Sequence, residues 1–527
     1  MENKKTKIIS IVAVVALALT IITATYAYFN AQVGDPAAAD IKVNANTVDT
    51  FTFSNGNAIS FSINQDNFAS GKGNQTGSTY ASATLTANNK TNTATEHYYL
   101  YLNIEDNTFT YSINENTPEI IMTVTDSAGT EITDISTLTH VIVTGANGTQ
   151  VSGYDITNKS GLITLFDNRE ITTTSSKEEK WNITITFVNY DENQNANAGK
   201  SMSAKVMIQK EVIPQVVSDV CSNGTNLATC ITTLANKSIP SATNIYHHDS
   251  SLSNGAGDNS YRYAGASDVV NNFVCFGSNE STCPTDNLYR IIGVFGNNVK
   301  LIKYDYGTTD ELGTDGDYNQ TYKEWGMDST YKGTYGDGER IGVYYWNNAT
   351  QTNTWSESLL NKTNLNTNFI NNIGEEWANK IATTTWKVGG GSWSNIATLV
   401  PATAYQYEVG SSASTTTYDA KIGLMYVSDY YYSSSPSAWT LVGYNSSDAT
   451  KDYRAAKTIT WLCLGSAEWT ISRNSDNSNH AFFVNDTCHV YNYTVTFSFA
   501  VRPSFNLESS VKYVSGSGSM SDPVRVK

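Results

Sequence analysis

The chain is poor in charged residues, and basic residues are the scarcer kind. Only 16% of its 527 residues are Asp, Glu, Lys or Arg, and the formal net charge is −16. Nucleic acids and anionic lipid surfaces are bound through a basic footprint, which this composition does not supply. Neither is therefore expected as a partner. Uncharged polar residues dominate instead, while 33 Tyr, 17 Phe and 10 Trp supply apolar side chains for folded cores.

Cysteine is missing from the first part of the chain, since none precedes Cys221. The spacing also lacks tight C-x-x-C pairs with His partners, so a zinc site is not expected. If the chain is exported, as its N-terminus indicates below, an even number of cysteines indicates disulfides. Pairing between nearest neighbours is the natural prediction, although other connectivities are possible: Cys221 with Cys230, Cys275 with Cys283, and Cys463 with Cys488.

Common catalytic signatures are missing as well. The sequence has no Gly-x-Ser-x-Gly, no His-Glu-x-x-His and no P-loop. His97 and His140 are isolated and are expected at the surface or at strand ends. His247-His248-Asp249 is the densest histidine cluster, and its Ser- and Gly-rich surroundings favour solvated side chains over metal ligands. We therefore predict a protein that is not an enzyme and has no cofactor, apart from the calcium considered below.

The N-terminus has the pattern of a membrane-targeting leader. Basic residues precede a stretch without charge from Ile8 to Phe29, which is long enough to span a bilayer core of about 20 apolar residues. Residues 1–29 are therefore a signal peptide or a retained transmembrane anchor. Either outcome places the rest of the chain outside the cytoplasm, as an extracellular or cell-surface protein. An uncleaved leader would also hold it to the membrane.

Residues 30–212 read as strands and turns. Trp181 to Phe187 and Tyr98 to Ile104 alternate apolar and polar residues, which is typical of strands with one buried face. Residues 121–124, 141–143 and 206–208 are further candidate strands. Short strands at this spacing predict an antiparallel β-sandwich.

The end of the leader, Thr25-Tyr-Ala-Tyr-Phe-Asn30, resembles that of the camelysin and TasA-type biofilm proteins of Gram-positive bacteria. The run from Trp181 to Lys210 is similar to the closing strands of the same family. The resemblance implies cleavage between Tyr28 and Phe29 and a sandwich that follows. It also implies an alternative function, a fibre-forming matrix subunit that self-assembles by donating residues 29–48 as a strand.

Residues 213–243 are expected to be a linker with one short helix at 227–236. The following region, 244–527, shows an α+β pattern. Leu288 to Phe295 and Val299 to Lys303 flank a Gly-Asn-Asn turn and predict a β-hairpin. Apolar residues spaced four apart, Ile373, Trp377 and Ile381, predict a helix over 366–383.

The second region also carries recognisable segments: Tyr261 to Gly265, Asn272 to Phe276, Ile422 to Asp429, Trp469 to Arg473, and Phe499 to Phe505. Together they resemble a C-terminal module of exported Firmicutes proteins, similar to the C-type-lectin-like fold of formylglycine-generating factors. The resemblance implies a lectin-like module over 244–527. It also leaves open an enzyme related to those factors, for which Cys463 and Cys488 are the candidate thiols. A structural disulfide explains these two cysteines more simply.

Two sets of residues are candidate ligand sites. Asp310, Asp315, Asp317 and Asn319 offer oxygen donors at alternating positions, as calcium prefers, although the register of an EF-hand fails. A solvated acidic loop is the simpler interpretation. Aromatic residues could form a platform for a glycan or another surface ligand, or could fill the core: Trp346, Trp393, Tyr430, Tyr431, Tyr432 and Trp439.

Arg502, in Ala-Val-Arg-Pro, is expected to be a buried ion-pair partner. The whole sequence is best interpreted as a non-enzymatic surface or extracellular-matrix protein. Its sandwich would serve as a stalk or assembly unit, and its lectin-like module would be displayed for binding.

Overall fold

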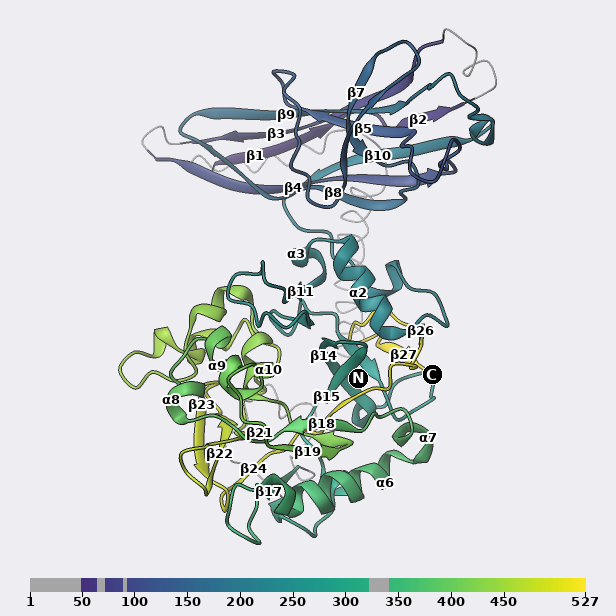
Figure 1. Ribbon diagram of the computed structural model, residues 1–527. Coiled ribbons are helices and arrows are strands. Elements are labelled where there is room, and N and C mark those ends of the chain that lie inside the picture. The colour runs from purple at the N-terminus through teal and green to yellow at the C-terminus, as the bar shows by residue number, and fades with distance from the viewer. Residues whose placement is uncertain (1–48, 64–71, 89–91, 322–340) are drawn as a thin grey trace, which may run out of the picture. The chain divides into compact units, whose positions relative to one another are not determined.

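The computed structural model describes residues 49–63, 72–88, 92–321 and 341–527. The chain is mainly β, with 38% strand and 18% helix. It divides into two compact units, Met1–Val212 and Ile213–Lys527 (Figure 1). Within the described ranges, no helix is both long enough and apolar enough to cross a membrane. The predicted leader, 8–29, and its cleavage site at Tyr28–Phe29 lie outside those ranges.

The first unit consists of two antiparallel sheets. One has the order β1 (Thr50–Asn55), β3 (Gln75–Thr86), β9 (Ser176–Phe187), β5 (Ile120–Thr125), β7 (Gln150–Asp155), β6 (His140–Thr144). The other has the order β2 (Ile59–Ser62), β10 (Ser201–Gln209), β4 (Ala94–Asn107), β8 (Gly161–Thr173). A short 3-10 helix, η2 (Asn195–Asn197), precedes β10.

Both sheets contribute to one core in this unit. Trp181, Ile183 and Ile185 of β9 are buried on alternate positions, and they share a cluster with Leu102 and Ile104 of β4. All five segments that alternation and apolar runs predicted as strands lie within observed strands. Here the apolar pattern sets which face of each strand is buried, because alternate side chains point to opposite faces.

The second unit is built around a nine-stranded sheet (Figure 1). Its main path is β20 (Ile422–Gly423), β25 (Ser504–Asn506), β15 (Asn298–Lys303), β14 (Leu288–Phe295), β13 (Phe273–Cys275), β27 (Val524–Val526), β26 (Tyr513–Ser515). Strands β11 (Ile245–His247) and β12 (Tyr261–Tyr263) extend it through the pairing of β12 with β14. The predicted hairpin is confirmed as β14 and β15, joined at Gly296, whose φ of 60° suits glycine.

Smaller elements surround this sheet. Three further sheets combine β16 (Tyr318–Thr321), β17 (Gly342–Tyr345) and β24 (Ser498–Phe499); β18 (Thr384–Lys387) and β19 (Thr417–Ala420); and β21 (Glu468–Arg473), β22 (His480–Val484) and β23 (Val490–Thr494). The α-helices are α2 (Leu227–Lys237), α3 (Pro240–Thr243), α4 (Thr309–Leu312), α6 (Ile370–Ile373), α7 (Glu375–Ala378), α8 (Trp393–Ile396), α9 (Pro401–Glu408) and α10 (Val427–Tyr432). The 3-10 segments are η3 (Val217–Asp219), η4 (Thr285–Asn287), η5 (Trp355–Glu357), η7 (Pro436–Thr440), η8 (Ala449–Lys451) and η9 (Tyr453–Ala456), and η6 (Leu360–Phe369) is a π-helix.

The helix predicted over 366–383 is shorter and starts earlier. Helix η6 begins at Leu360 and continues into α6, which ends at Ile373. Gly374, with a φ of 82°, breaks the helix before the single turn of α7. The four-residue spacing of Ile373, Trp377 and Ile381 therefore reflects burial in a shared core rather than one continuous helix.

The segment predicted as a linker, 213–243, belongs to the second compact unit. Its predicted helix is observed as α2, and Leu227, Ile231 and Leu234 join the main core of that unit. The helix therefore packs into the second unit through its apolar face.

Candidate binding site

The six cysteines form three disulfides with the predicted nearest-neighbour connectivity. Each closes a local loop, with sequence separations of 9, 8 and 25 residues. All three lie in the second unit. By restricting the unfolded chain, each of the two smaller loops contributes about 2–3 kcal/mol.

The four residues of the predicted calcium loop do not point to a common centre. Asp317 is buried, and its two oxygens accept hydrogen bonds from the backbone N–H groups of Asn348 (2.9 Å) and Leu360 (2.8 Å). Burial raises the pKa of Asp317 against these bonds. Asp315 accepts from Asn368 (2.7 Å). Within the described ranges, no group of three or more His, Cys, Asp or Glu side chains is arranged to hold a metal ion.

The other two residues of that loop are placed apart from Asp317. Asn319 donates its amide N–H to the Ser498 hydroxyl and accepts from the Tyr345 hydroxyl, both at 2.8 Å. Asp310 lies on α4 and lines the pocket described below. Asp315, Asp317 and Asn319 are thus engaged in hydrogen bonds with other parts of the second unit.

Five of the six predicted platform residues are buried rather than exposed. Trp346, Tyr430, Tyr431, Tyr432 and Trp439 are each at most 1% exposed. Their polar atoms donate to backbone carbonyl oxygens; Tyr430 donates to Cys488 (2.6 Å) and Tyr431 to Ile396 (2.8 Å). Helix α10 is enclosed on every side, so its Tyr triplet fills the core. Only Trp393 of the six is partly exposed.

The prediction of solvated histidines at 247–248 is half right. His247 is partly exposed and stacks on Tyr261, with ring centroids 4.2 Å apart. His248 is buried, and its Nδ1 accepts the backbone N–H of Ala256 (3.0 Å). Burial, followed by the nearby Arg262, lowers the pKa of His248 well below its usual value. A neutral imidazole in the core is therefore a structural residue.

His97 and His140, predicted at the surface or at strand ends, are both partly exposed; His140 begins β6, whereas His97 lies within β4. His140 is 2.9 Å from Glu131, and His97 is 3.6 Å from Glu170.

Arg502 is confirmed as a buried ion-pair partner. Its guanidinium donates two hydrogen bonds to Glu468, at 2.5 and 2.6 Å, and both side chains are 2% exposed. Burial raises the pKa of Glu468, and Arg502 opposes this shift.

A second buried ionic network surrounds the start of α10. The Glu408 carboxylate accepts the backbone N–H groups of Val427 and Ser428, both at 2.8 Å, and Asp429 accepts that of Tyr426. Lys300 donates to Asp429 at 2.5 Å, so a cation from β15 neutralises this helix start. Burial raises the pKa of Glu408 and lowers that of Lys300.

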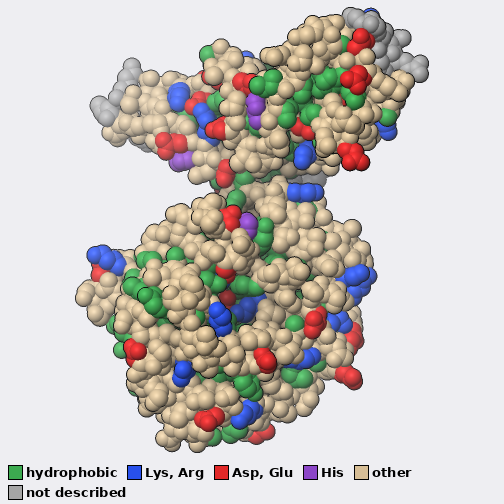
Figure 2. All heavy atoms as spheres, viewed as in Figure 1, with side chains coloured by type: hydrophobic (Ala, Val, Ile, Leu, Met, Phe, Trp, Pro, Cys, Tyr) green, Lys and Arg blue, Asp and Glu red, His purple; other side chains and the backbone are tan. Residues whose placement is uncertain are grey.

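The network continues through Arg262, which lies 3.6 Å from Asp429 and 2.7 Å from Asp258. Burial opposes ionisation of Asp258, but Arg262 and Ser260 outweigh it and lower its pKa to about 2. The charges of this network are held by each other and by backbone groups. Figure 2 shows the second unit hollowed near the middle of the face in view, with basic and acidic side chains inside the hollow.

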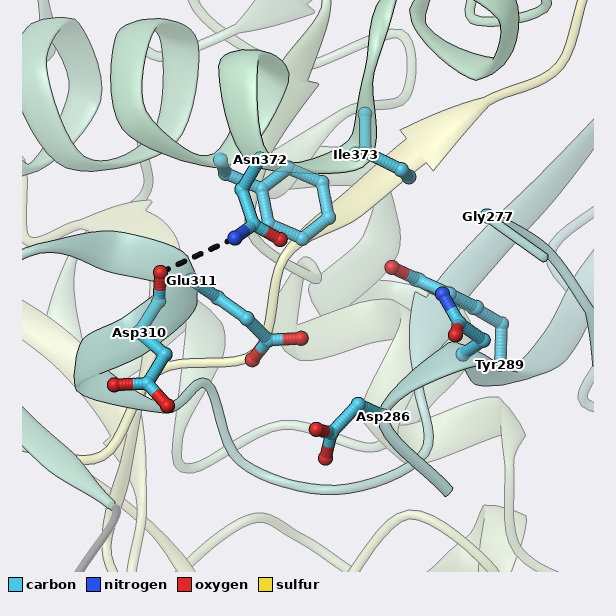
Figure 3. A pocket seen from close by; sticks show the side chains of 9 residues that line it. Gly277, Asp286, Tyr289, Asp310, Glu311, Asn372 and Ile373 are labelled. Atoms are coloured by element: carbon cyan, nitrogen blue, oxygen red, sulfur yellow. Dashed lines mark hydrogen bonds between the residues drawn. The ribbon is translucent and has the colours of Figure 1, made fainter. Parts of the chain in front are cut away.

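A distinct pocket of about 290 Å³ lies beside α4 and the helix formed by η6 and α6. Its lining combines three carboxylates with amides and a few apolar side chains: Gly277, Asp286, Asn287, Tyr289, Asp310, Glu311, Phe369, Asn372 and Ile373. Figure 3 shows the carboxylates of Asp286 and Glu311 facing the same space from different elements, with Asn372 on the helix above.

The pocket walls are set by local structure. Glu311 closes a capping box with Thr308 at the start of α4, which fixes its carboxylate. Asn372 donates to the backbone oxygen of Asp310 (3.2 Å), which ties the helix to α4. Gly277 has a φ of 97°, and a Cβ at this position would lie 2.5 Å from the Asn287 amide. Glycine therefore keeps this wall open.

The pocket is acidic. Lys303, which is fully buried, pairs with Glu311 at 3.0 Å and donates to the backbone oxygen of Asp286 at 2.9 Å. Of the three carboxylates that line the pocket, that of Glu311 is paired with this ammonium. Such a lining favours a ligand that donates hydrogen bonds, through hydroxyl or ammonium groups, and disfavours an anion.

Sequence patterns located only part of this pocket. Asp310 and Glu311 stand in the acidic run that suggested calcium, whereas Asp286 and Asn372 lie far away in sequence. The hairpin prediction placed Tyr289 on a strand, but nothing local indicated that helix 360–373 would cover the carboxylates.

Comparison of the chain with protein-family models, curated proteins and solved structures gave no match.

Proposed function

We propose that the chain is an exported protein that acts outside the cytoplasm by binding rather than by catalysis. The first unit would be a camelysin- or TasA-type sandwich that serves as a stalk or assembly unit. The second would be a C-type-lectin-like module that presents a binding site. A signal peptide or membrane anchor at residues 1–29 would deliver both.

The observation that carries this proposal is the set of three disulfides in the second unit. Disulfides persist in oxidising compartments and are rare where thioredoxin and glutathione keep thiols reduced. No free cysteine occurs among the described residues. A protein cross-linked by three disulfides is suited to the oxidising environment outside the cell.

The pocket beside α4 supports binding of a polar ligand. Its carboxylates and amides suit a glycan, above all one that carries an amine. Three buried carboxylates elsewhere in this unit, those of Glu408, Asp429 and Glu468, are each engaged by backbone N–H groups or cations. This engagement favours structural over catalytic roles for them.

A fibre-forming matrix subunit is a second candidate. Strand β6 is at the edge of its sheet, and Ile142 on it is 65% exposed. An open apolar edge is a site where another strand can pair. The enzyme alternative has less support, because Cys463 and Cys488 are joined to each other.

Localisation tests the proposal of export. Cells that produce the full chain are fractionated, and the protein is treated with a thiol-reactive polyethylene glycol before and after reduction. We expect recovery outside the cytoplasm and labelling of six thiols only after reduction. Recovery from the cytoplasm with thiols that label at once would overturn the proposal.

Ligand binding tests the pocket separately. The full chain is titrated with methyl glucoside and with glucosamine, and so are Asp286→Asn and the control Asp476→Asn, which removes the same charge from an exposed turn. We expect Asp286→Asn to weaken glucosamine binding by about tenfold, and the control to bind normally. Equal binding by all three proteins would exclude this pocket.

A further inference from the structure

Exposed aromatic rings gather on and around the edge strand β23. Tyr491, Tyr493 and Phe497 are 36%, 43% and 48% exposed, and Trp393 and Tyr444 beside them are partly exposed. These five residues are called the aromatic surface below. None lines the pocket beside α4.

Strand geometry presents two of these rings together. Tyr491 and Tyr493 occupy alternate positions of β23 and therefore project from the same face, about 7 Å apart along the strand. Strand β23 lies at the edge of its three-stranded sheet, so one of its flanks is not covered by a strand of that sheet. This arrangement offers two neighbouring rings to an extended ligand.

The rings are held in place by other rings. The centroid of the Tyr491 ring lies 4.9 Å from that of Trp393 and 5.3 Å from that of Tyr444, and both pairs meet edge to face. Tyr493 contacts Phe497 edge to face at 4.9 Å. Because these rings are already ordered, a ligand that stacks on them loses little side-chain entropy on binding.

The charge beside this surface is paired: the Arg454 guanidinium lies 5.2 Å from the centroid of the Tyr444 ring and forms an ion pair with Asp452 at 2.6 Å. From Thr487 to Phe499 the chain has no Lys, Arg, Asp or Glu. With a net charge of −16, the chain repels anionic lipid and acidic polymers. A neutral partner that carries both apolar faces and hydroxyl groups complements this surface best.

We propose that the aromatic surface binds an uncharged polysaccharide, whose sugar rings stack on Tyr491, Tyr493 and Phe497. This site is separate from the pocket beside α4. It adds a polymer-binding face to the binding function proposed above, and it does not require the pocket to be occupied.

The experiment is retention of the full chain on insoluble or gel-embedded neutral polymers: cellulose, β-1,3-glucan, starch and mannan. The test variant is Tyr493→Ala with Phe497→Ala, and the conservative variant is Tyr493→Phe with Phe497→Tyr. Met520→Ala is the control, because it removes another exposed apolar side chain of the same unit, 49% exposed. Thermal unfolding confirms that each variant is folded.

We expect wild type, the conservative variant and the control to be retained on at least one polymer, and the double alanine variant to bind about tenfold more weakly. The pocket variant Asp286→Asn should be retained like wild type, which separates this site from the pocket. Failure of wild type to bind any of the four polymers would overturn the proposal. Equal retention of the double alanine variant would do the same. The proposal would also be overturned if the double alanine variant lost only self-association or binding to anionic vesicles and kept its binding to the neutral polymers.

Discussion

Single buried charges in the second unit show how the chain tolerates polar groups in its cores. Arg290 is fully buried and lies between the rings of Phe273 and Trp461, at 4.3 and 4.7 Å from their centroids. It donates to Asn272 and to the backbone oxygen of Val270. Burial lowers the pKa of Arg290 to about 9. Arg290 is thus held by aromatic faces and neutral acceptors, whereas Arg502 is held by the carboxylate of Glu468.

At the same scale, His248 should make stability depend on pH. Its pKa is depressed in the folded chain, so below about pH 6.5 the unfolded chain binds a proton that the folded chain does not. Stability should therefore fall as pH falls from 7.5 to 5, by up to about 1.4 kcal/mol per pH unit below the unfolded pKa. Urea unfolding at several pH values measures this slope.

His248→Gln is the matched variant, because its amide oxygen can still accept the N–H of Ala256. It should flatten the slope below pH 6.5. A slope identical to that of wild type would show that His248 does not control it. His489, whose pKa burial also lowers, would then be the next group to replace.

At the scale of elements, the strands of the first unit and the hairpin β14–β15 could be predicted because their apolar periodicity and turn residues are local signals. The helix near 366–383 could not be predicted correctly. The four-residue spacing of Ile373, Trp377 and Ile381 fits one continuous helix, but it also fits two short helices separated by a break at Gly374 whose apolar residues pack into the same core. The aromatic residues were recognised, but their exposure depends on distant partners. Tyr430 is covered by the loop at Cys488, whereas Tyr493, which carried no motif, lies at an edge.

No sequence pattern predicted the role of Glu119. Glu119 precedes β5 and is fully buried, and its carboxylate accepts hydrogen bonds from Ser112, Gln194 and Asn197. It thus ties β5 to the loop before it and to the segment around η2.

Glu119→Ala should lower the free energy of unfolding of the first unit by about 3 kcal/mol or more, because the amides of Gln194 and Asn197 would be left buried without this acceptor. Glu119→Gln keeps one acceptor oxygen and should cost less. Glu115→Ala, an exposed change in the same loop, is the control and should stay within about 0.5 kcal/mol. Chemical denaturation measures all three, and equal values for Glu119→Ala and Glu115→Ala would contradict this role.

For the whole molecule, the uneven distribution of cysteine predicts unequal responses to reductant. All three disulfides lie in the second unit, and no cysteine precedes residue 221. In calorimetry with and without a phosphine reductant, the transition of the second unit should move to lower temperature while that of the first stays in place. A shift of both transitions, or of neither, would show that the disulfides do not act on the second unit alone.

The short spacing of the paired cysteines also bears on how the protein matures. A chain that emerges N-terminus first presents Cys221 and Cys230 together, then Cys275 and Cys283, and Cys463 with Cys488 last. Each cysteine meets its correct partner before the next pair arrives, so sequential oxidation would give the native connectivity without a catalyst that reshuffles mispaired bonds.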